Sequence, residues 1–307
     1  MRAIDRSLLH MSPAMRMAIF IGTTGISLIL GAFVTFSLVA AYLHIGLAQT
    51  QFVLLQPGNA HISLFANAFA SIISFLIPSI AVAFFTSGSV LKNMGFKSVA
   101  NFKLVNWVIL LAIAGLLLSG AMATLTELIP IPATFKTWAM DLEETYKKAM
   151  LAMTKMNSVF DLVINLFAVA FLPAIVEELY FRGALQTTIK CWTGNYIIAI
   201  VVTSIIFSAF HFSYFGFLSR MVLGIILGYI YEYTKTIWLP ILLHFINNGI
   251  AIIALYSVHG DPNKVNKVMD ENLPIYWGVI AGVAVVTIFV QLKKDANYEG
   301  LDQSIQH

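Results

Sequence analysis

The chain has 307 residues, of which 59% are hydrophobic and only 11% are charged. This composition excludes an ordinary soluble globular domain and indicates a polytopic membrane protein. The formal net charge is only +3 and the basic residues are spread along loops, so we expect no nucleic-acid partner. The single cysteine, Cys191, excludes an intrachain disulfide and any multi-cysteine zinc site.

Long apolar runs predict about eight transmembrane helices in a single all-α unit. The first run is too long for the core of a signal peptide and has no small-residue cleavage site, so we expect it to be retained. The expected spans cover residues 17–42, 62–85, 104–125, 159–189, 196–212, 217–233, 237–256 and 275–292.

A hydrophilic insertion separates the third and fourth spans. Its apolar residues recur at near-helical spacing among Glu143, Glu144, Lys147 and Lys148, which predicts an amphipathic helix in contact with the membrane interface. These apolar residues are Trp138, Met140, Leu142, Tyr146, Met150 and Met153.

Basic residues near the span ends predict the orientation. Most fall on one side, which the positive-inside rule assigns to the cytoplasm. We therefore expect a multi-pass protein of a bacterial cytoplasmic membrane with both termini cytoplasmic. The residues used are Arg2, Arg6, Arg16, Lys92, Lys97, Lys103, Lys190, Lys235, Lys293 and Lys294.

Three charges, Glu177, Glu178 and Arg182, lie inside the apolar fourth span. A charge at membrane depth costs roughly 3 kcal/mol or more, so such residues indicate a functional site. Glu178 and Arg182 are four residues apart and are expected to pair. Glu177 lies about 100° further round the helix and is left free to face another helix. Pro173 removes a backbone hydrogen bond, which allows a kink.

Two histidines, His211 and His244, lie inside apolar spans. Each could simply bond to a neighbouring helix. At about 1.5 Å of rise per residue, both can share the hydrocarbon layer with Glu177, so a common cavity is possible. Asn248 follows His244 by four residues and shares its helix face, whereas Asn247 points elsewhere.

These residues form three motifs in chain order: Glu-Glu-x-x-x-Arg from Glu177, Phe-x-x-x-His from Phe207 to His211, and His-x-x-x-Asn from His244 to Asn248. The set resembles the CPBP family of intramembrane proteases, which includes CAAX prenyl endopeptidases and bacteriocin-processing enzymes. The resemblance covers residues 171–251.

The resemblance implies roles for the motif residues. Glu177 and His211 would hold and deprotonate a water molecule, while His244 and Asn248 would stabilise the oxyanion of peptide-bond hydrolysis. Glu178 and Arg182 would organise the site, with Phe207 and Asn247 in support. The expected partners are a peptide or membrane-protein substrate and the lipid bilayer.

The same reading divides the chain into a three-span region with its amphipathic helix (1–158), a catalytic core (159–292) and a cytoplasmic tail (293–307). We expect no required cofactor. The alternative is a zinc ion on Glu177, His211 and His244, but the chain has no His-Glu-x-x-His helix, and Asn248 suits an oxyanion donor better than a metal site.

Two other functions compete with the protease hypothesis. One is a non-catalytic scaffold or self-immunity protein of the same fold, which would have no need of an unpaired carboxylate at Glu177. The other is a proton-coupled transporter, which is disfavoured because no repeat halves are visible. The sequence does not define the substrate, its prenylation, the oligomeric state or the biological pathway.

Overall fold

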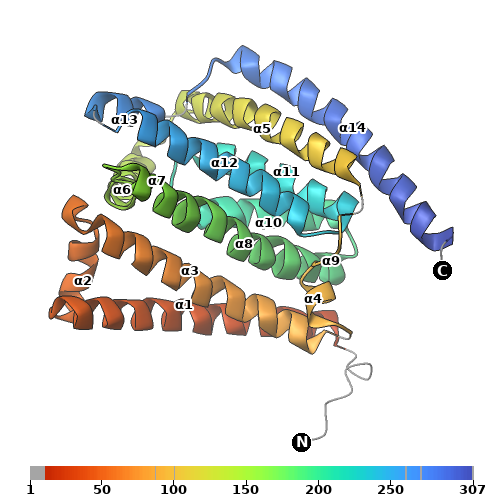
Figure 1. Cartoon of the computed structure of the whole chain (residues 1–307), viewed down its shortest axis with the longest axis horizontal. Helices are drawn as coiled ribbons and strands as arrows, with labels where there is room; N and C mark the ends of the chain where they lie inside the picture. Colours follow the sequence, from red (N-terminus) through yellow and green to blue (C-terminus); the bar gives the residue numbers. More distant parts are fainter. Residues whose placement is uncertain (1–10, 87, 100, 260, 270–271, 306–307) are drawn as a thin grey trace, which may run out of the picture.

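A computed structural model describes residues 11–86, 88–99, 101–259, 261–269 and 272–305, and over these ranges the protein is a bundle of helices without strands (Figure 1). The predicted all-α class is confirmed. The helices are α1 Pro13–Leu43, α2 Leu47–Leu54, η2 Pro57–Asn59, α3 Ala60–Phe85, α4 Val90–Asn93, α5 Phe102–Leu128, α6 Ala133–Met153, α7 Val159–Asn165, η3 Leu166–Phe171, α8 Leu172–Glu178, η4 Leu179–Gln186, α9 Thr187–Thr193, α10 Tyr196–Ala209, α11 Phe217–Thr234, α12 Trp238–Ser257, α13 Pro262–Met269 and α14 Ile275–Ile305.

Within the described ranges, six helices are long and apolar enough to cross a membrane: α1, α3, α5, the continuous helix of residues 159–193, α12 and α14. The predicted number of about eight spans is not confirmed. The two remaining predicted spans correspond to α10, which has only 14 residues, and to α11, which has 18 residues and includes Arg220 and Glu232. The chain is a multi-pass integral membrane protein.

The bundle has two edges and a centre. Helices α1 and α3 pack together at one edge and α5 packs with α14 at the other, while the helix of residues 159–193, α10, α11 and α12 lie between them (Figure 1). Large apolar side chains point outward, as shown by Ile29 and Phe33 of α1, which are 75% and 62% exposed. Such an apolar exterior suits contact with lipid.

Short polar residues set several helix ends. Ser12 caps α1 by accepting a hydrogen bond from the Met15 N–H, and Asn101 does the same for the Lys103 N–H at the start of α5. Asn195 caps α10 by accepting from the Ile197 N–H at 2.8 Å. Gly194 has a φ of 66°, which ends α9 in a conformation that glycine adopts without strain. The sharp turn at Gly194 returns the chain as α10 beside the helix it has just left.

The central helix, residues 159–193, is not a uniform α-helix. Two π-helical segments, η3 and η4, lie before and after Pro173. Proline has no N–H to give to the carbonyl of Val169 four residues earlier, so the regular bonding ladder is interrupted there. π-Helical turns are common at functional sites. Here they flank the segment that carries Glu177 and Glu178.

The helix predicted in the insertion exists as α6. Glu143, one of its charged residues, is only 8% exposed, which the sequence pattern did not predict. Its Oε2 accepts hydrogen bonds from Ser213 Oγ at 3.0 Å and from the Phe215 N–H at 3.2 Å. One face of α6 therefore attaches to the loop that follows α10. Contact of its other face with the membrane stays a prediction.

The lysines used to predict the orientation gather at one end of the bundle. Figure 1 places α4, the end of α9 and the start of α12 at that end, and Lys92, Lys190 and Lys235 lie in or next to these elements. Arg2 and Arg6 lie outside the described residues. The assignment of this end to the cytoplasm stays a prediction.

Candidate active site

Glu178 joins two of the three sequence motifs. Its side chain has no exposed surface, and its Oε1 lies 2.8 Å from Arg182 Nη1 and 2.8 Å from His244 Nδ1. The predicted Glu178–Arg182 pair is therefore confirmed, and the bond to His244 is an addition to it. Arg182 is equally buried and also donates to the Gly224 carbonyl of α11 at 3.1 Å. These bonds hold α8, α11 and α12 in one register.

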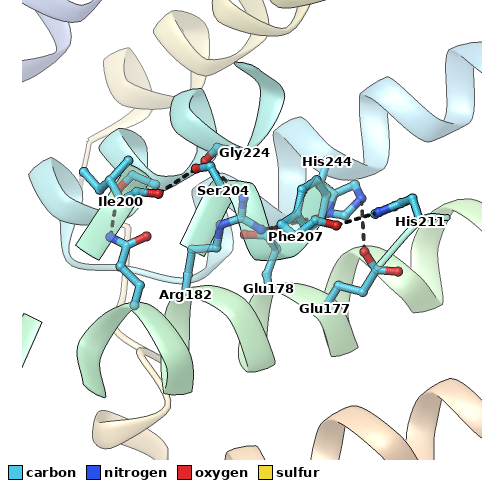
Figure 2. A network of polar contacts seen from close by, with 11 residues as sticks. Glu177, Glu178, Arg182, Ile200, Ser204, Phe207, His211, Gly224 and His244 are labelled. Carbon is cyan, nitrogen blue, oxygen red and sulfur yellow. Dashed lines mark hydrogen bonds and ion pairs between the residues drawn. The ribbon is translucent and has the colours of Figure 1, made fainter. Parts of the chain in front are cut away.

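Glu177 faces α12, as its position on the helix predicts. Its Oε2 lies 3.9 Å from His244 Nε2, beyond hydrogen-bonding distance, and that buried oxygen has no hydrogen-bond partner (Figure 2). A buried carboxylate oxygen without a partner is costly, so such an atom requires an explanation. Glu178 therefore makes the structural bonds through its Oε1, and Glu177 Oε2 takes part in none of them.

Each active-site histidine uses Nδ1 for a structural bond. His211 Nδ1 lies 2.8 Å from the Phe207 carbonyl oxygen, which can only accept, so Nδ1 carries the proton. His244 Nδ1 likewise donates to Glu178. In the neutral form, both rings therefore present an unprotonated Nε2. The Glu177 carboxylate and these Nε2 atoms are all acceptors, a set to which a water molecule can donate its protons.

The two asparagines of the third motif form a short relay. Asn247 Nδ2 donates to Asn248 Oδ1 at 3.3 Å, which leaves the Asn248 amide nitrogen free to point elsewhere. That nitrogen lies 3.5 Å from the Val169 carbonyl oxygen of η3. At this distance the bond is weak. Asn248 can therefore exchange it for a stronger acceptor, and Asn247 orients its amide.

The Phe207 ring contacts the Arg182 guanidinium and both histidine rings of the site. Its ring is 1% exposed and lies 4.8 Å from the Arg182 guanidinium and 4.8 Å from the His211 ring. The His244 ring is 5.8 Å away, so all three motifs meet around this side chain (Figure 2). A cation over an aromatic face is stabilised by the ring quadrupole. Phe207 thus supports Arg182 while it excludes water from it.

His211 does not lie inside a span as expected. Helix α10 ends at Ala209, so His211 occupies the loop that begins there. Phe212 has a φ of 49°, which turns the chain away from the helix axis. The predicted span reached Phe212 because the apolar run continues past the helix end. The position at the end still brings His211 to the ring of Phe207.

Arg220, near the start of α11, was not among the site residues predicted from the sequence. Its guanidinium lies against Gly216, in the loop that carries His211, which makes Arg220 a further candidate. Its guanidinium lies 4.7 Å over the Tyr146 ring and donates to the Tyr146 hydroxyl at 2.5 Å, while Nη1 is buried without a partner. Gly216 leaves the required space, because a Cβ there would lie 1.8 Å from Nη1. A cation inside an apolar run, the signal that identified Glu177, also marks Arg220.

The alternative zinc set receives no support from the geometry. Across the described residues, no group of three or more His, Cys, Asp and Glu side chains lies close enough to hold a metal ion. Glu177, His211 and His244 therefore form no such group in the described structure. Metal independence stays a prediction.

The fold and site define a polytopic helical membrane protein with a buried carboxylate and histidine cluster. Residues 159–250 match the family model described as type II CAAX prenyl endopeptidase Rce1-like. This stretch contains all three motifs, so the family resemblance is confirmed there.

A curated relative is the uncharacterized protein YpbD of Bacillus subtilis (strain 168), which is 33% identical over 111 residues. The match covers 35% of this chain and 54% of YpbD, so the chain spans about half the length of that relative. No solved structure matches the chain.

Proposed function

We propose that this protein is an intramembrane endopeptidase in which Glu177 activates the attacking water. The observation that carries the proposal is the division of labour between adjacent carboxylates. Glu178 binds both Arg182 and His244 through Oε1, whereas the nearest charged group printed for the buried Glu177 Oε2 is His244 Nε2, 3.9 Å away and beyond hydrogen-bonding distance. A carboxylate that is buried in the site and takes part in none of its structural bonds supports a role in the reaction.

In the proposed reaction, a water molecule donates to Glu177 and to His211 Nε2. Glu177 removes one proton as the oxygen attacks the scissile carbonyl carbon, and the carbonyl oxygen becomes an oxyanion. The Asn248 N–H turns from the Val169 carbonyl to this oxyanion, and His244 donates through Nε2 when both its ring nitrogens are protonated. The C–N bond then breaks, and protonated Glu177 gives its proton to the leaving amine.

The remaining motif residues keep this geometry. Glu178 holds the His244 ring in place, Arg182 balances the charge of Glu178, and Phe207 excludes water from this ion pair. In a site with few mobile dipoles, each such bond is stronger than in water. No step in this scheme uses a metal ion.

The substrate is proposed to be a peptide or membrane protein that presents a bond within or near the bilayer. The description of the matching family names prenylated CAAX proteins as one substrate class. Among the described residues we identify no feature that selects a prenyl group, so the proposal covers unprenylated membrane peptides as well.

A comparison of protein termini in cells tests the proposal. Cells that carry the intact protein are compared with cells that carry Glu177→Ala, by mass spectrometry of new N- and C-termini in membrane and secreted peptides. Glu144→Gln is the control because Glu144 is exposed and its pair with Lys148 lies at the surface. We expect defined products with the intact protein and the control, and none with Glu177→Ala at equal protein levels. Identical termini in all three would favour the scaffold hypothesis.

A further inference from the structure

A second polar site lies at the end of the bundle that carries α4 and the end of α9. It is a cavity of about 120 Å³ lined by Lys92, Lys97, Lys190, Lys235 and Glu232, together with Gly95, Thr187 and Tyr231. Four lysines face one glutamate, which leaves an excess of three positive charges around a small volume. None of the motif residues described above lines this cavity.

The lysines converge from three separate parts of the chain. Lys92 and Lys97 come from α4 and the loop after it, Lys190 comes from α9, and Lys235 follows α11. Lysines that only set the orientation of a membrane protein need to lie on the correct side, but they have no reason to share one cavity. Their convergence therefore indicates a ligand.

The framework of the cavity is fixed by backbone contacts. The Gly95 carbonyl accepts from the Ile237 N–H at 2.8 Å, and the Lys97 carbonyl accepts from Thr236 Oγ1 at 2.7 Å. Gly95 has a φ of 89°, and a Cβ there would lie 2.9 Å from the Tyr231 ring. The turn between Lys92 of α4 and Lys97 is thus held against the end of α11 by a glycine that no other residue replaces without strain.

The charges inside the cavity are only partly balanced. Glu232 Oε1 accepts from Lys190 Nζ at 2.6 Å and from Lys235 Nζ at 2.5 Å, so one carboxylate serves two ammonium groups. In the described part of the chain, Lys92 and Lys97 form no side-chain ion pair. Partial burial is the main cause that lowers the pKa of Lys235, with the charge of Lys190 acting in the same direction. An anion in the cavity would offset the repulsion between these ammonium groups.

A further cation lies at its border. Arg16 of α1 donates to Thr187 Oγ1 at 2.7 Å and to Thr188 Oγ1 at 3.1 Å. Thr187 itself lines the cavity, so the guanidinium is held one side chain away from it. Arg16 therefore adds a further positive charge next to the cavity.

We propose that this cavity binds a phosphate group, with the ammonium groups of Lys92, Lys97, Lys190 and Lys235 as its donors. A volume of about 120 Å³ is several times the roughly 10–15 Å³ that a cavity needs to hold one water molecule, which leaves room for a small tetrahedral anion. The cavity lies where the spanning helices end, which is the depth of lipid headgroups. Basic pockets in this position recognise phosphate-bearing headgroups. A free phosphate compound has the same chemistry, and the experiment separates the two sources.

The test uses the full chain purified into nanodiscs of phosphatidylcholine, with thermal unfolding as the readout. One arm adds phosphatidic acid to the bilayer, and the other adds inorganic phosphate to the buffer. The test variant is Lys92→Gln/Lys97→Gln, which removes two charges without breaking an ion pair of the described structure. Lys103→Gln is the matched control, because this exposed lysine lies near the same end but does not line the cavity.

We expect phosphatidic acid to raise the unfolding temperature of the wild type and of Lys103→Gln. The double variant should show a rise in apparent dissociation constant of about tenfold or more, since each lysine near an anionic surface contributes to binding. Stabilisation by inorganic phosphate as well would identify a soluble phosphate compound as a ligand, and stabilisation by phosphatidic acid alone would identify a lipid headgroup. No stabilisation in either arm, or an equal response of all three proteins, would overturn the proposal. The readout is binding, so it is independent of protease activity.

Discussion

The buried pair of Glu178 and Arg182 gives a quantitative test of the site. Both side chains have no exposed surface, and they lie 2.8 Å apart. Removing one partner of a buried ion pair leaves an uncompensated charge and costs about 3–5 kcal/mol, whereas replacing both is often nearly neutral. We therefore expect Glu178→Ala and Arg182→Met each to lose about 3–5 kcal/mol of unfolding free energy. The double variant should lose no more than either single variant.

The assay is reversible unfolding in bicelles, combined into a double-mutant cycle, with peptide cleavage measured on the same preparations. The expected coupling between the two positions is about 3 kcal/mol, at the upper end of measured couplings. Cleavage should stay low in the double variant although its stability returns, because His244 has lost the acceptor of its Nδ1–H. Additive losses of stability, or full cleavage by the double variant, would refute this account of Glu178.

Three further predictions concern α6, Arg220 and metals. Glu143→Ala leaves the Ser213 hydroxyl and the Phe215 N–H without their acceptor, so we expect the free energy of unfolding to fall by about 1–3 kcal/mol and proteolysis within α6 to become faster. The control Glu144→Ala should change neither quantity. Equal behaviour of the two variants would contradict the burial of Glu143. Gly216→Ala should displace the Arg220 guanidinium and lower the cleavage rate about 10-fold to 100-fold. The control Gly46→Ala should cleave normally, because no atom lies within 4 Å of its added Cβ. A fully active Gly216→Ala would show that the position of Arg220 does not matter for cleavage. Cleavage should persist after treatment with 1,10-phenanthroline, and a loss that zinc restores would establish metal dependence.

Local spacing predicted the parts of the site that depend on one helix. The pairing of Glu178 with Arg182 and the position of Glu177 facing a neighbouring helix follow from helix geometry alone. Apolar runs predicted the all-α fold for the same reason, because burial in lipid requires helices. The number of spans was less secure, since α10 and α11 are short or carry charges in apolar surroundings.

Contacts between distant segments could not be read from periodicity. Glu178 and His244 are 66 residues apart, and Asn248 meets Val169 across 79 residues. The resemblance grouped the motifs, but it gave no indication that Asn248 contacts the Val169 carbonyl. The sequence pattern named Glu143 among the charged residues of the amphipathic helix and did not predict that it is buried. Its spacing from Ala139 and Tyr146 places it on the face that packs inward.

The central claim is that Glu177 activates the water that hydrolyses the peptide bond. The most direct measurement is the steady-state cleavage of an identified substrate by purified wild-type protein and by Glu177→Gln, both reconstituted in the same lipid and shown to unfold at the same temperature. Loss of a general base predicts a fall in kcat of about 10²–10⁴-fold with little change in KM. A Glu177→Gln variant that keeps most of its kcat would contradict the claim.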